Sequence, residues 1–227
     1  MAHVERVVVL APMALELDAV VREFELGVER TGRVGSVEVF ARATDIGMHA
    51  AAEATRAAMA LAPDHVMIVG IAGGVDPRMA IGTVIDPAIV TDRVERESFA
   101  TGISGATGEL SCGDDFITDR AAIDELRRAG VVALDMESAA VVRECVRAGV
   151  AWSVHRAISD RPDDGLVDES IWSMTTADGH ADSKALDEYL RADPARRYRL
   201  RQLAHDATAA AAAAARAARQ HLDRLGI

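Results

Sequence analysis

The sequence has few cysteines, the residues whose disulfides or zinc sites stabilise folds that lack a large hydrophobic core. It contains 2 cysteines, Cys112 and Cys145, whose spacing fits neither a disulfide framework nor a zinc motif. Basic residues are outnumbered by acidic ones, and the formal net charge is −11. Because such a charge repels phosphates, the chain is not expected to bind nucleic acid or an anionic membrane. A small neutral or cationic substrate is compatible with this charge.

Long hydrophobic runs are also missing. The apolar run in the N-terminal stretch MAHVERVVVLAP is too short for a signal peptide or a membrane span, so it predicts a first β-strand. We therefore expect a cytoplasmic protein. Hydrophobic residues make up 50% of the chain, and glycine and proline are scattered rather than concentrated in a linker. Residues 1–227 are predicted to form a single domain.

Short runs of β-branched and apolar residues alternate with helical patterns along the chain. The runs 7–10, 66–69 and 154–158 are continuous, which is typical of strands buried on both faces of a mainly parallel sheet. Further strands are expected at 37–40, 84–90 and 131–134, and helices at 17–24, 49–61 and 136–146. The alternation predicts an α/β layered fold. After Asp193-Pro194, about 30 residues without a helix breaker predict a long helix over about 194–225.

Candidate site residues follow several of the expected strands, where ligands bind in parallel α/β sheets. Taken one at a time, each has an ordinary explanation. Glu16 is compatible with a solvated helix position, and the glycines at 70, 73 and 74 favour a plain turn. Glu137 fits either a vicinal diol, through two accepted hydrogen bonds, or the dipole of the helix that it opens. Asp160 serves equally as a cap or as a site residue.

Five segments together resemble the nucleoside phosphorylase and nucleosidase superfamily, and most closely the 5′-methylthioadenosine/S-adenosylhomocysteine nucleosidases. They are VVVLAPMALELDAV, IVGIAGGVDPRMAIGTVI, SCGDDFI, ALDMESAAV and VHRAISD, and they occur in the family's order over positions 5 to 160. The resemblance implies a three-layer α/β/α fold with a twisted, mostly parallel central sheet, as in purine nucleoside phosphorylase. It also implies a homodimer, a small purine nucleoside as substrate, and no metal or organic cofactor.

The resemblance assigns two catalytic residues. Asp160 would donate a proton to N7 of the departing purine, which requires a carboxyl pKa raised toward the working pH. Glu16 would orient or deprotonate the attacking water. The substrate would be held by Glu137 on the 2′ and 3′ hydroxyls and by Phe116 stacked on the purine. The remaining residues implied at the substrate, through side chain or backbone, are Met13, Gly73, Ile117, Met136 and Ser159.

Two aliphatic residues favour hydrolysis over phosphorolysis. In hexameric bacterial purine phosphorylases, an arginine and a serine stand at the places of Ile68 and Ile71 and hold phosphate. An aliphatic side chain cannot neutralise a phosphate dianion. The sequence therefore favours water as the nucleophile, although a phosphorolytic purine or nucleoside phosphorylase remains the alternative.

The stretch between Asp92 and Ser111 is several tens of residues shorter than in the nucleosidases that the chain resembles. In those proteins, this stretch reaches across the dimer to cover the 5′-alkylthio group of the substrate. The segments GIAGGVDP and LDMES also resemble those of hopanoid-associated phosphorylases, which act on an adenosyl group with a bulky 5′ lipid. A non-catalytic nucleoside-binding homologue is a third possibility. The 161–193 region, with Trp172 and Met174, is a candidate for closing the 5′ pocket instead.

Histidines and cysteines give weak signals of function. Asp178-Gly179-His180-Ala181-Asp182 brings a histidine near carboxylates, but a solvated loop explains it better than a metal site. His155, inside an expected strand, is interpreted as a core histidine, and Cys145 as a small buried hydrophobic residue.

Overall fold

The computed structural model describes residues 4–103, 105–162, 164, 171, 174, 176, 182–193 and 195–225. Its strands are β1 (Arg6–Ala11), β2 (Thr31–Val34), β3 (Val37–Ala43), β4 (His65–Gly74), β5 (Val84–Ile85), β6 (Ile89–Asp92), β7 (Glu97–Ala100), β8 (Glu109–Cys112), β9 (Val131–Asp135) and β10 (Ala151–Asp160). Its helices are α1 (Ala14–Glu23), α2 (Met48–Ala58), α3 (Arg120–Arg128), α4 (Ser138–Ala148), α6 (Ser183–Ala192) and α7 (Arg196–Leu225).

The strands form one mixed sheet in the order β2-β3-β1-β4-β9-β8-β6-β7, and β10 pairs with β4 and β5. The pairings of β1 with β3 and β4, of β4 with β10, and of β8 with β6 and β9 are parallel. The strands β2, β5 and β7 pair antiparallel, as do two residues of β4 with β9. The predicted α/β fold with a mostly parallel central sheet is therefore confirmed.

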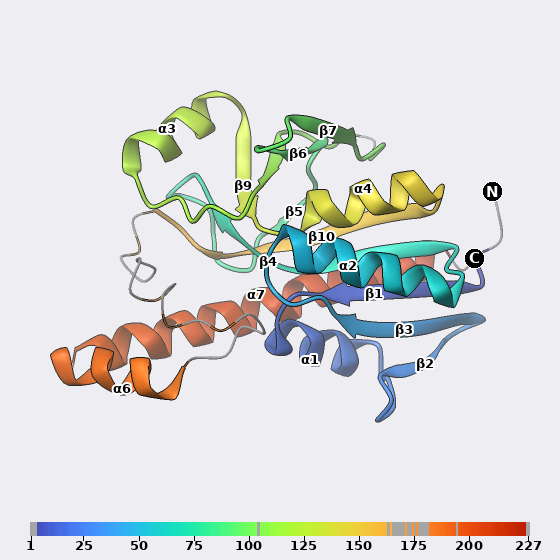
Figure 1. Cartoon of the computed structure of the whole chain (residues 1–227), viewed down its shortest axis with the longest axis horizontal. Coiled ribbons are helices and arrows are strands. Elements are labelled where there is room, and N and C mark those ends of the chain that lie inside the picture. The colour runs from blue at the N-terminus through green and yellow to red at the C-terminus, as the bar shows by residue number, and fades with distance from the viewer. Residues whose placement is uncertain are drawn as a thin grey trace.

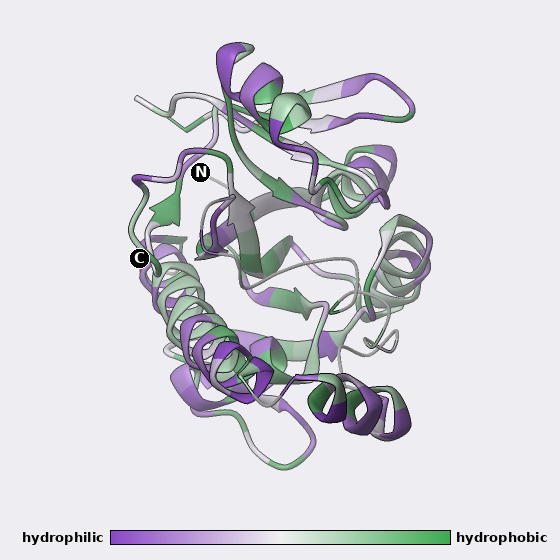
Figure 2. Ribbon diagram, turned by 90° about the vertical axis from the view of Figure 1, so that its left-hand side faces the viewer, coloured by the Kyte–Doolittle hydropathy of each residue, from purple (hydrophilic) through white to green (hydrophobic). Residues whose placement is uncertain are grey.

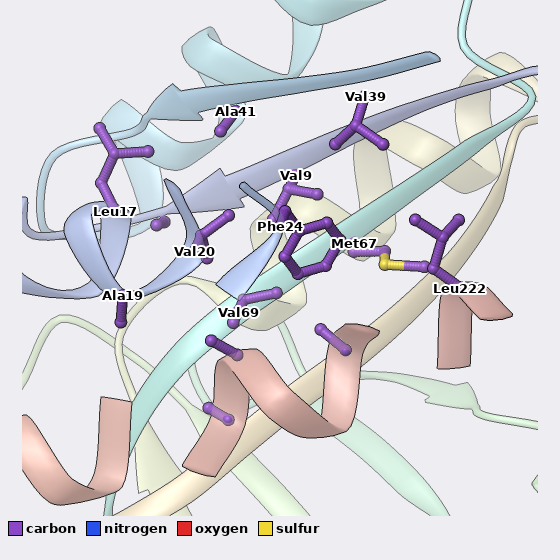
Figure 3. Packing of buried hydrophobic residues seen from close by; sticks show 14 of the residues in the cluster. Val9, Leu17, Ala19, Val20, Phe24, Val39, Ala41, Met67, Val69 and Leu222 are labelled. Atoms are coloured by element: carbon purple, nitrogen blue, oxygen red, sulfur yellow. The ribbon is translucent and has the colours of Figure 1, made fainter. Parts of the chain in front are cut away.

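Helices cover both faces of the sheet and make the three layers (Figure 1). On one face, α1 and α7 pack on β1, β3 and β4, and Figure 3 shows Phe24 and Val20 beside Val9 and Met67 in this core. On the other face, α2 and α4 pack on the opposite side chains of the same strands, such as Val8. Successive residues of β1 thus enter different cores, which explains why its sequence is apolar without alternation.

The long helix α7 is fixed to the sheet by alanines. It spans 30 residues, and Ala210, Ala214 and Ala218 are fully buried against the sheet and α1. Small side chains let the helix axis approach the strands closely. The exposed residues of α7 are mostly polar, and Figure 2 shows hydrophobic and hydrophilic residues combined on the peripheral helices. The predicted helix over about 194–225 is confirmed within the described residues, which exclude Pro194.

Several elements differ from the sequence expectation. The strand β4 continues to Gly74, so the glycine-rich stretch is not a turn. The run 84–90 is divided into β5 and β6 by Asp86-Pro87. The helix α4 begins at Ser138, which leaves Glu137 as its N-cap. The shortened stretch after Asp92 contains β7, paired antiparallel with β6. The sequence patterns did not predict β2, β8, α3 or α6, which are short or strongly polar.

None of the helices in the described part of the chain combines the length and apolarity that a membrane crossing requires.

Candidate active site

A cavity of about 240 Å³ opens where the carboxyl ends of β1, β4, β9 and β10 meet. Its volume far exceeds the roughly 10–15 Å³ that one water needs. Every residue that the sequence analysis assigned to the site lines this cavity: Met13, Glu16, Gly73, Phe116, Ile117, Met136, Glu137, Ser159 and Asp160. The chain thus brings together positions separated by more than a hundred residues.

Glu16 lies in the first turn of α1 and is held by backbone donors. Its Oε2 accepts a hydrogen bond from Met13 N at 2.7 Å, and its Oε1 accepts one from Ile71 N at 2.7 Å. The first bond closes the N-terminal turn of the helix, which explains why a glutamate suits this position. The side chain is 1% exposed. Glu16 is therefore a buried carboxyl and not the solvated one that its helix pattern alone suggested.

Arg156 in β10 is fully buried and binds three carboxylates. Its Nη2 lies 2.7 Å from Asp135 Oδ2 and 3.0 Å from Glu137 Oε2, and its Nη1 lies 3.6 Å from Glu16 Oε1. It also donates from Nε to Ser138 Oγ at 3.1 Å. Sequence reasoning assigned no role to Arg156 or Asp135, although a charged residue inside an apolar strand was a usable signal.

Glycine at position 70 provides the room for this cluster. A Cβ atom there would overlap Glu16 Oε1 and Arg156 Nη1. The cluster can therefore sit directly against the backbone of β4, and the glycine serves close packing of side chains.

Glu137 is fixed from both sides of the cavity. Its Oε2 accepts from Arg156, and its Oε1 accepts a hydrogen bond from Gly47 N at 3.1 Å. Gly47 precedes α2 and has φ +106°, a conformation that favours glycine. The carboxylate of Glu137 thus joins the N-termini of α2 and α4 at the cavity wall.

Burial raises the pKa values of the site carboxyls. Loss of hydration raises the pKa of Glu16 to about 7, although Arg156 and the two backbone donors act in the opposite direction. Burial also raises the pKa of Glu137, again against the effect of Arg156. One guanidinium does not compensate three buried carboxyls, so protons are retained in this cluster near neutral pH.

Asp160 ends β10 at the cavity, where the neighbouring Arg161 is paired with Asp164. Ser159 Oγ donates to Asp160 Oδ2 at 2.6 Å, and Gly73 leaves space for the carboxyl, since a Cβ there would lie 3.3 Å from Asp160 Oδ1. Burial raises the pKa of Asp160, with the Ser159 hydrogen bond opposing it. The half-buried Asp160 and the buried Glu16 thus lie in separate hydrogen-bond environments, an arrangement suited to acid and base roles.

The remaining wall is the segment between β8 and α3. Asp115, Phe116, Ile117 and Thr118 line the cavity there, together with Arg93 from the end of β6. Sequence reasoning assigned no role to Arg93. Ile71, at the place of a phosphate-binding serine in the phosphorylases, also lines the cavity.

Within the described residues, no cluster of three or more histidine, cysteine, aspartate or glutamate side chains is arranged to hold a metal ion. The 178–181 part of the weak metal motif, and Trp172, lie outside the described residues. Cys145 and His155 are buried in the core, as interpreted from the sequence, and Met174 is buried as well.

Comparison with curated proteins identifies distant relatives. The chain is 24% identical over 163 residues to a 5′-methylthioadenosine/S-adenosylhomocysteine nucleosidase of Marinomonas sp., covering 57% of this chain and 71% of that protein. It is 26% identical over 164 residues to the protein of the same name from Geobacillus thermodenitrificans, covering 57% of this chain and 70% of that protein.

Solved structures share the fold at lower identity. The Helicobacter pylori 5′-methylthioadenosine/S-adenosylhomocysteine nucleosidase with butyl-thio-DADMe-Immucillin-A superposes with a TM-score of 0.71, at 16% identity, covering 98% of this chain and 100% of that chain. The futalosine hydrolase of Helicobacter pylori superposes with a TM-score of 0.71, at 15% identity, covering 97% and 98%.

A family profile extends over most of the chain. The profile of the phosphorylase superfamily matches residues 6–99 and 90–192, which include all of the candidate site residues. This protein is therefore a member of the phosphorylase superfamily.

Proposed function

We propose that the protein is a nucleosidase that hydrolyses the N-glycosidic bond of a purine nucleoside. The observation that carries this proposal is one cavity lined by three carboxyls with raised pKa values, the buried Glu16 and Glu137 and the half-buried Asp160. Cleavage of this bond develops negative charge on the base and positive charge on the ribose. An acid at the base neutralises the negative charge by giving a proton, and carboxylates at the ribose stabilise the positive charge.

The two catalytic roles follow from the environments of the two carboxyls. Protonated Asp160 gives its proton to N7 of the purine as the bond between C1′ and N9 breaks, and Ser159 orients it. Glu16, ionised, accepts a proton from a water whose oxygen forms the new bond to C1′. The products are the free base and the 5′-substituted ribose. The ionised carboxylate of Glu16 lies at the ribose end of the cavity, which favours an oxocarbenium-like transition state.

The other cavity residues hold the substrate. Glu137 accepts hydrogen bonds from the 2′ and 3′ hydroxyls, and Met13 and Met136 contact the sugar. Phe116 stacks on the purine, and the backbone of Ile117 and Gly73 meets its edge. Each of these groups lines the cavity, so one bound nucleoside would reach all of them.

The arrangement favours water over phosphate as the nucleophile. Arg156 is already bound by three carboxylates. Arg93 is engaged by Asp115 and Arg161 by Asp164, so each cationic residue along the cavity has an acidic partner. Arg156 therefore has no free positive charge for a phosphate dianion, and the ionised Glu16 beside it would repel one.

The proposed substrate is a 5′-substituted adenosine such as 5′-methylthioadenosine or S-adenosylhomocysteine, the compounds after which the relatives are named. The equally similar futalosine hydrolase adds futalosine as a second candidate. A homodimer and a cytoplasmic location, both expected from the sequence, belong to the same proposal.

A base-release assay tests the proposal. The purified protein is incubated with 5′-methylthioadenosine, S-adenosylhomocysteine, futalosine, adenosine and inosine, with and without phosphate, and free base is measured by chromatography. We expect release without phosphate. Release only with phosphate would identify a phosphorylase, and binding of a nucleoside without release would identify a non-catalytic homologue.

The variant Asp160→Asn tests the acid role. We expect base release to fall by about 10²–10⁴-fold, the usual contribution of a general acid. The matched control is Asp18→Asn, the same chemical change at an exposed position of α1, and it should retain wild-type activity. An Asp160→Asn protein as active as this control would contradict the assignment.

A further inference from the structure

We propose that Arg93 is a positioning residue for the base, which acts by fixing the backbone of residues 113–117, here called the base segment. The proposal rests on the proposed function, because Phe116 and Ile117 of this segment are the groups assigned to the purine. Arg93 itself follows the last residue of β6. It therefore joins the start of the shortened stretch to the wall of the cavity.

The guanidinium of Arg93 donates hydrogen bonds to the backbone carbonyls of alternate residues. Nη1 donates to Ser111 O at 2.8 Å, and Nη2 donates to Gly113 O at 3.3 Å and Asp115 O at 3.2 Å. Nη2 also donates to Asp115 Oδ1 at 2.6 Å. Because these carbonyls alternate along the chain and meet at one group, the backbone from Ser111 to Asp115 must curve around the guanidinium.

The base segment has no regular secondary structure to hold it. The strand β8 ends at Cys112 and α3 begins at Arg120, and the residues between them form neither helix nor strand. A hydrogen bond from Gly113 N to Asp135 O at 3.1 Å anchors its first residue. Asp114 Oδ1 accepts a hydrogen bond from Met48 N at 2.7 Å, and Arg93 holds the carbonyls of Gly113 and Asp115 on either side of it. Directly after Asp115, the chain presents Phe116 and Ile117 to the cavity.

The fit between the segment and Arg93 is close. A Cβ at Gly113 would lie 2.9 Å from Arg93 Nη2 and 2.8 Å from Asp115 Oδ1, so the glycine leaves room for the guanidinium. The side chain of Arg93 is 15% exposed, whereas that of Asp115 is 61% exposed. Since solvent screens an exposed ion pair, the carbonyl contacts rather than the Asp115 carboxylate should hold the segment.

The chemistry requires arginine at this position. A planar guanidinium directs several donors at fixed angles, so one side chain can satisfy carbonyls on different residues. A lysine would keep the charge but would offer a single ammonium centre. Arg93→Lys should therefore have an intermediate effect, and Arg93→Met, which keeps the aliphatic stem without donors, the full effect.

The test compares three variants with a matched control. They are Arg93→Met, Arg93→Lys and Asp115→Asn, and the control is Arg96→Met, which removes the same charge from an exposed position in the same β6–β7 turn. Amide hydrogen exchange of residues 111–118 is followed by mass spectrometry. In parallel, kcat and KM are measured on the substrate that the base-release assay identifies.

For Arg93→Met we expect exchange in residues 111–118 to become at least about tenfold faster, because the opened segment loses its anchors. We expect KM to rise by about tenfold or more and kcat to stay within about threefold, since the base is held equally in the ground state and the transition state. Arg96→Met should match the wild type in both measurements, and Asp115→Asn should leave the hydrogen exchange of residues 111–118 close to that of the wild type.

The exchange measurement does not depend on catalysis, so the two proposals fail separately. Unchanged exchange in Arg93→Met would overturn the inference even if the protein is a nucleosidase. Faster exchange with unchanged KM would overturn the link to base binding. If the wild type cleaves no nucleoside in the panel, the proposed function fails. Faster exchange, with weaker binding of free adenine measured by calorimetry, would then still support Arg93 as the residue that positions the base segment.

Discussion

At the scale of single residues, the buried charge around Arg156 determines what the acidic centre can do. Its guanidinium is the cation shared by Glu16, Asp135 and Glu137. In this poorly hydrated cluster, burial keeps the pKa values of Glu16 and Glu137 raised, although Arg156 opposes the effect. The same residue therefore stabilises the fold and sets the protonation of the carboxyls at the cavity.

Replacing Arg156 by methionine should destabilise the protein strongly. Removal of one partner from a buried ion pair costs roughly 3–5 kcal/mol of unfolding free energy, because the remaining charges stay buried and unpaired. The pKa values of Glu16 and Glu137 would rise further without Arg156, so the folded variant would bind protons that its unfolded chain releases. The loss of unfolding free energy relative to the wild type, measured by urea unfolding, should thus be smaller at about pH 5 than at about pH 8. An equal loss at both pH values would contradict this account.

The activity should depend on pH through Glu16. As a base it must be ionised, and its pKa is raised from 4.5 to about 7. We expect kcat/KM to rise with pH up to about 7 and to fall about tenfold per pH unit below that value. Asp160 must stay protonated, so its loss of the proton limits activity on the alkaline side. The Asp18→Asn control should keep the same profile. A profile that is flat between about pH 5 and pH 8 would exclude Glu16 as the base.

At the scale of elements, β4 and its glycines decide how near the site groups lie to the sheet. The strand continues through Gly73 and Gly74, where it pairs with both β10 and β9. It therefore carries the backbone of the parallel sheet directly into the cavity wall. Side chains from α1 and β10 use the room above Gly70.

Alanine at Gly70 should disrupt the site. The added methyl group would overlap Glu16 and Arg156, which are buried and hydrogen-bonded and cannot move aside freely. We expect kcat/KM to fall at least about tenfold and the unfolding free energy to fall by about 1–3 kcal/mol, as for other overpacked positions. The control is Gly27→Ala, where the nearest atom would lie 3.6 Å away. Base release and urea unfolding measure both effects, and wild-type values for Gly70→Ala would refute the steric argument.

At the scale of the whole molecule, α7 closes one face of the sheet beside a cluster of histidines. His65 Nε2 and His155 Nε2 lie 2.8 Å and 3.0 Å from Ser153 Oγ. The ring of His221 on α7 lies 5.6 Å from that of His65 and 5.1 Å from that of His155. Burial lowers the pKa of His65 to about 4 and of His155 to about 3, and it lowers the pKa of His221.

These histidines should make the fold sensitive to acid. Their folded pKa values lie below the usual 6.5, so between about pH 6.5 and pH 4 the unfolded chain binds protons that the folded protein excludes. The stabilisation is complete above pH 6.5 and is lost as the pH falls. Glu16 contributes with the opposite sign, so the comparison must be made against a variant. Between about pH 7 and pH 5, the unfolding free energy measured in urea should fall less for the double variant His65→Gln/His155→Gln than for the wild type. Equal losses would exclude the cluster as the cause.

The sequence by itself determined the α/β class, the long C-terminal helix and the candidate residues at strand ends. These depend on local information, because the periodicity of apolar residues reports burial and helix breakers report boundaries. Glu16 and Asp160 were assigned to the site through the resemblance to the nucleosidases, because local patterns alone also allowed a solvated helix position and a cap. The structure places both at one cavity. Their catalytic roles remain proposals.

Only the tertiary structure decided which charges meet. Arg156 contacts Glu16, Asp135 and Glu137 because β10 pairs with β4 in parallel register and α1 packs beside them. Arg93 reaches the base segment because β6 and β8 are neighbours in the sheet. Such contacts depend on strand order and register, which no local pattern encodes. Burial then sets the pKa values that give the carboxyls their proposed roles.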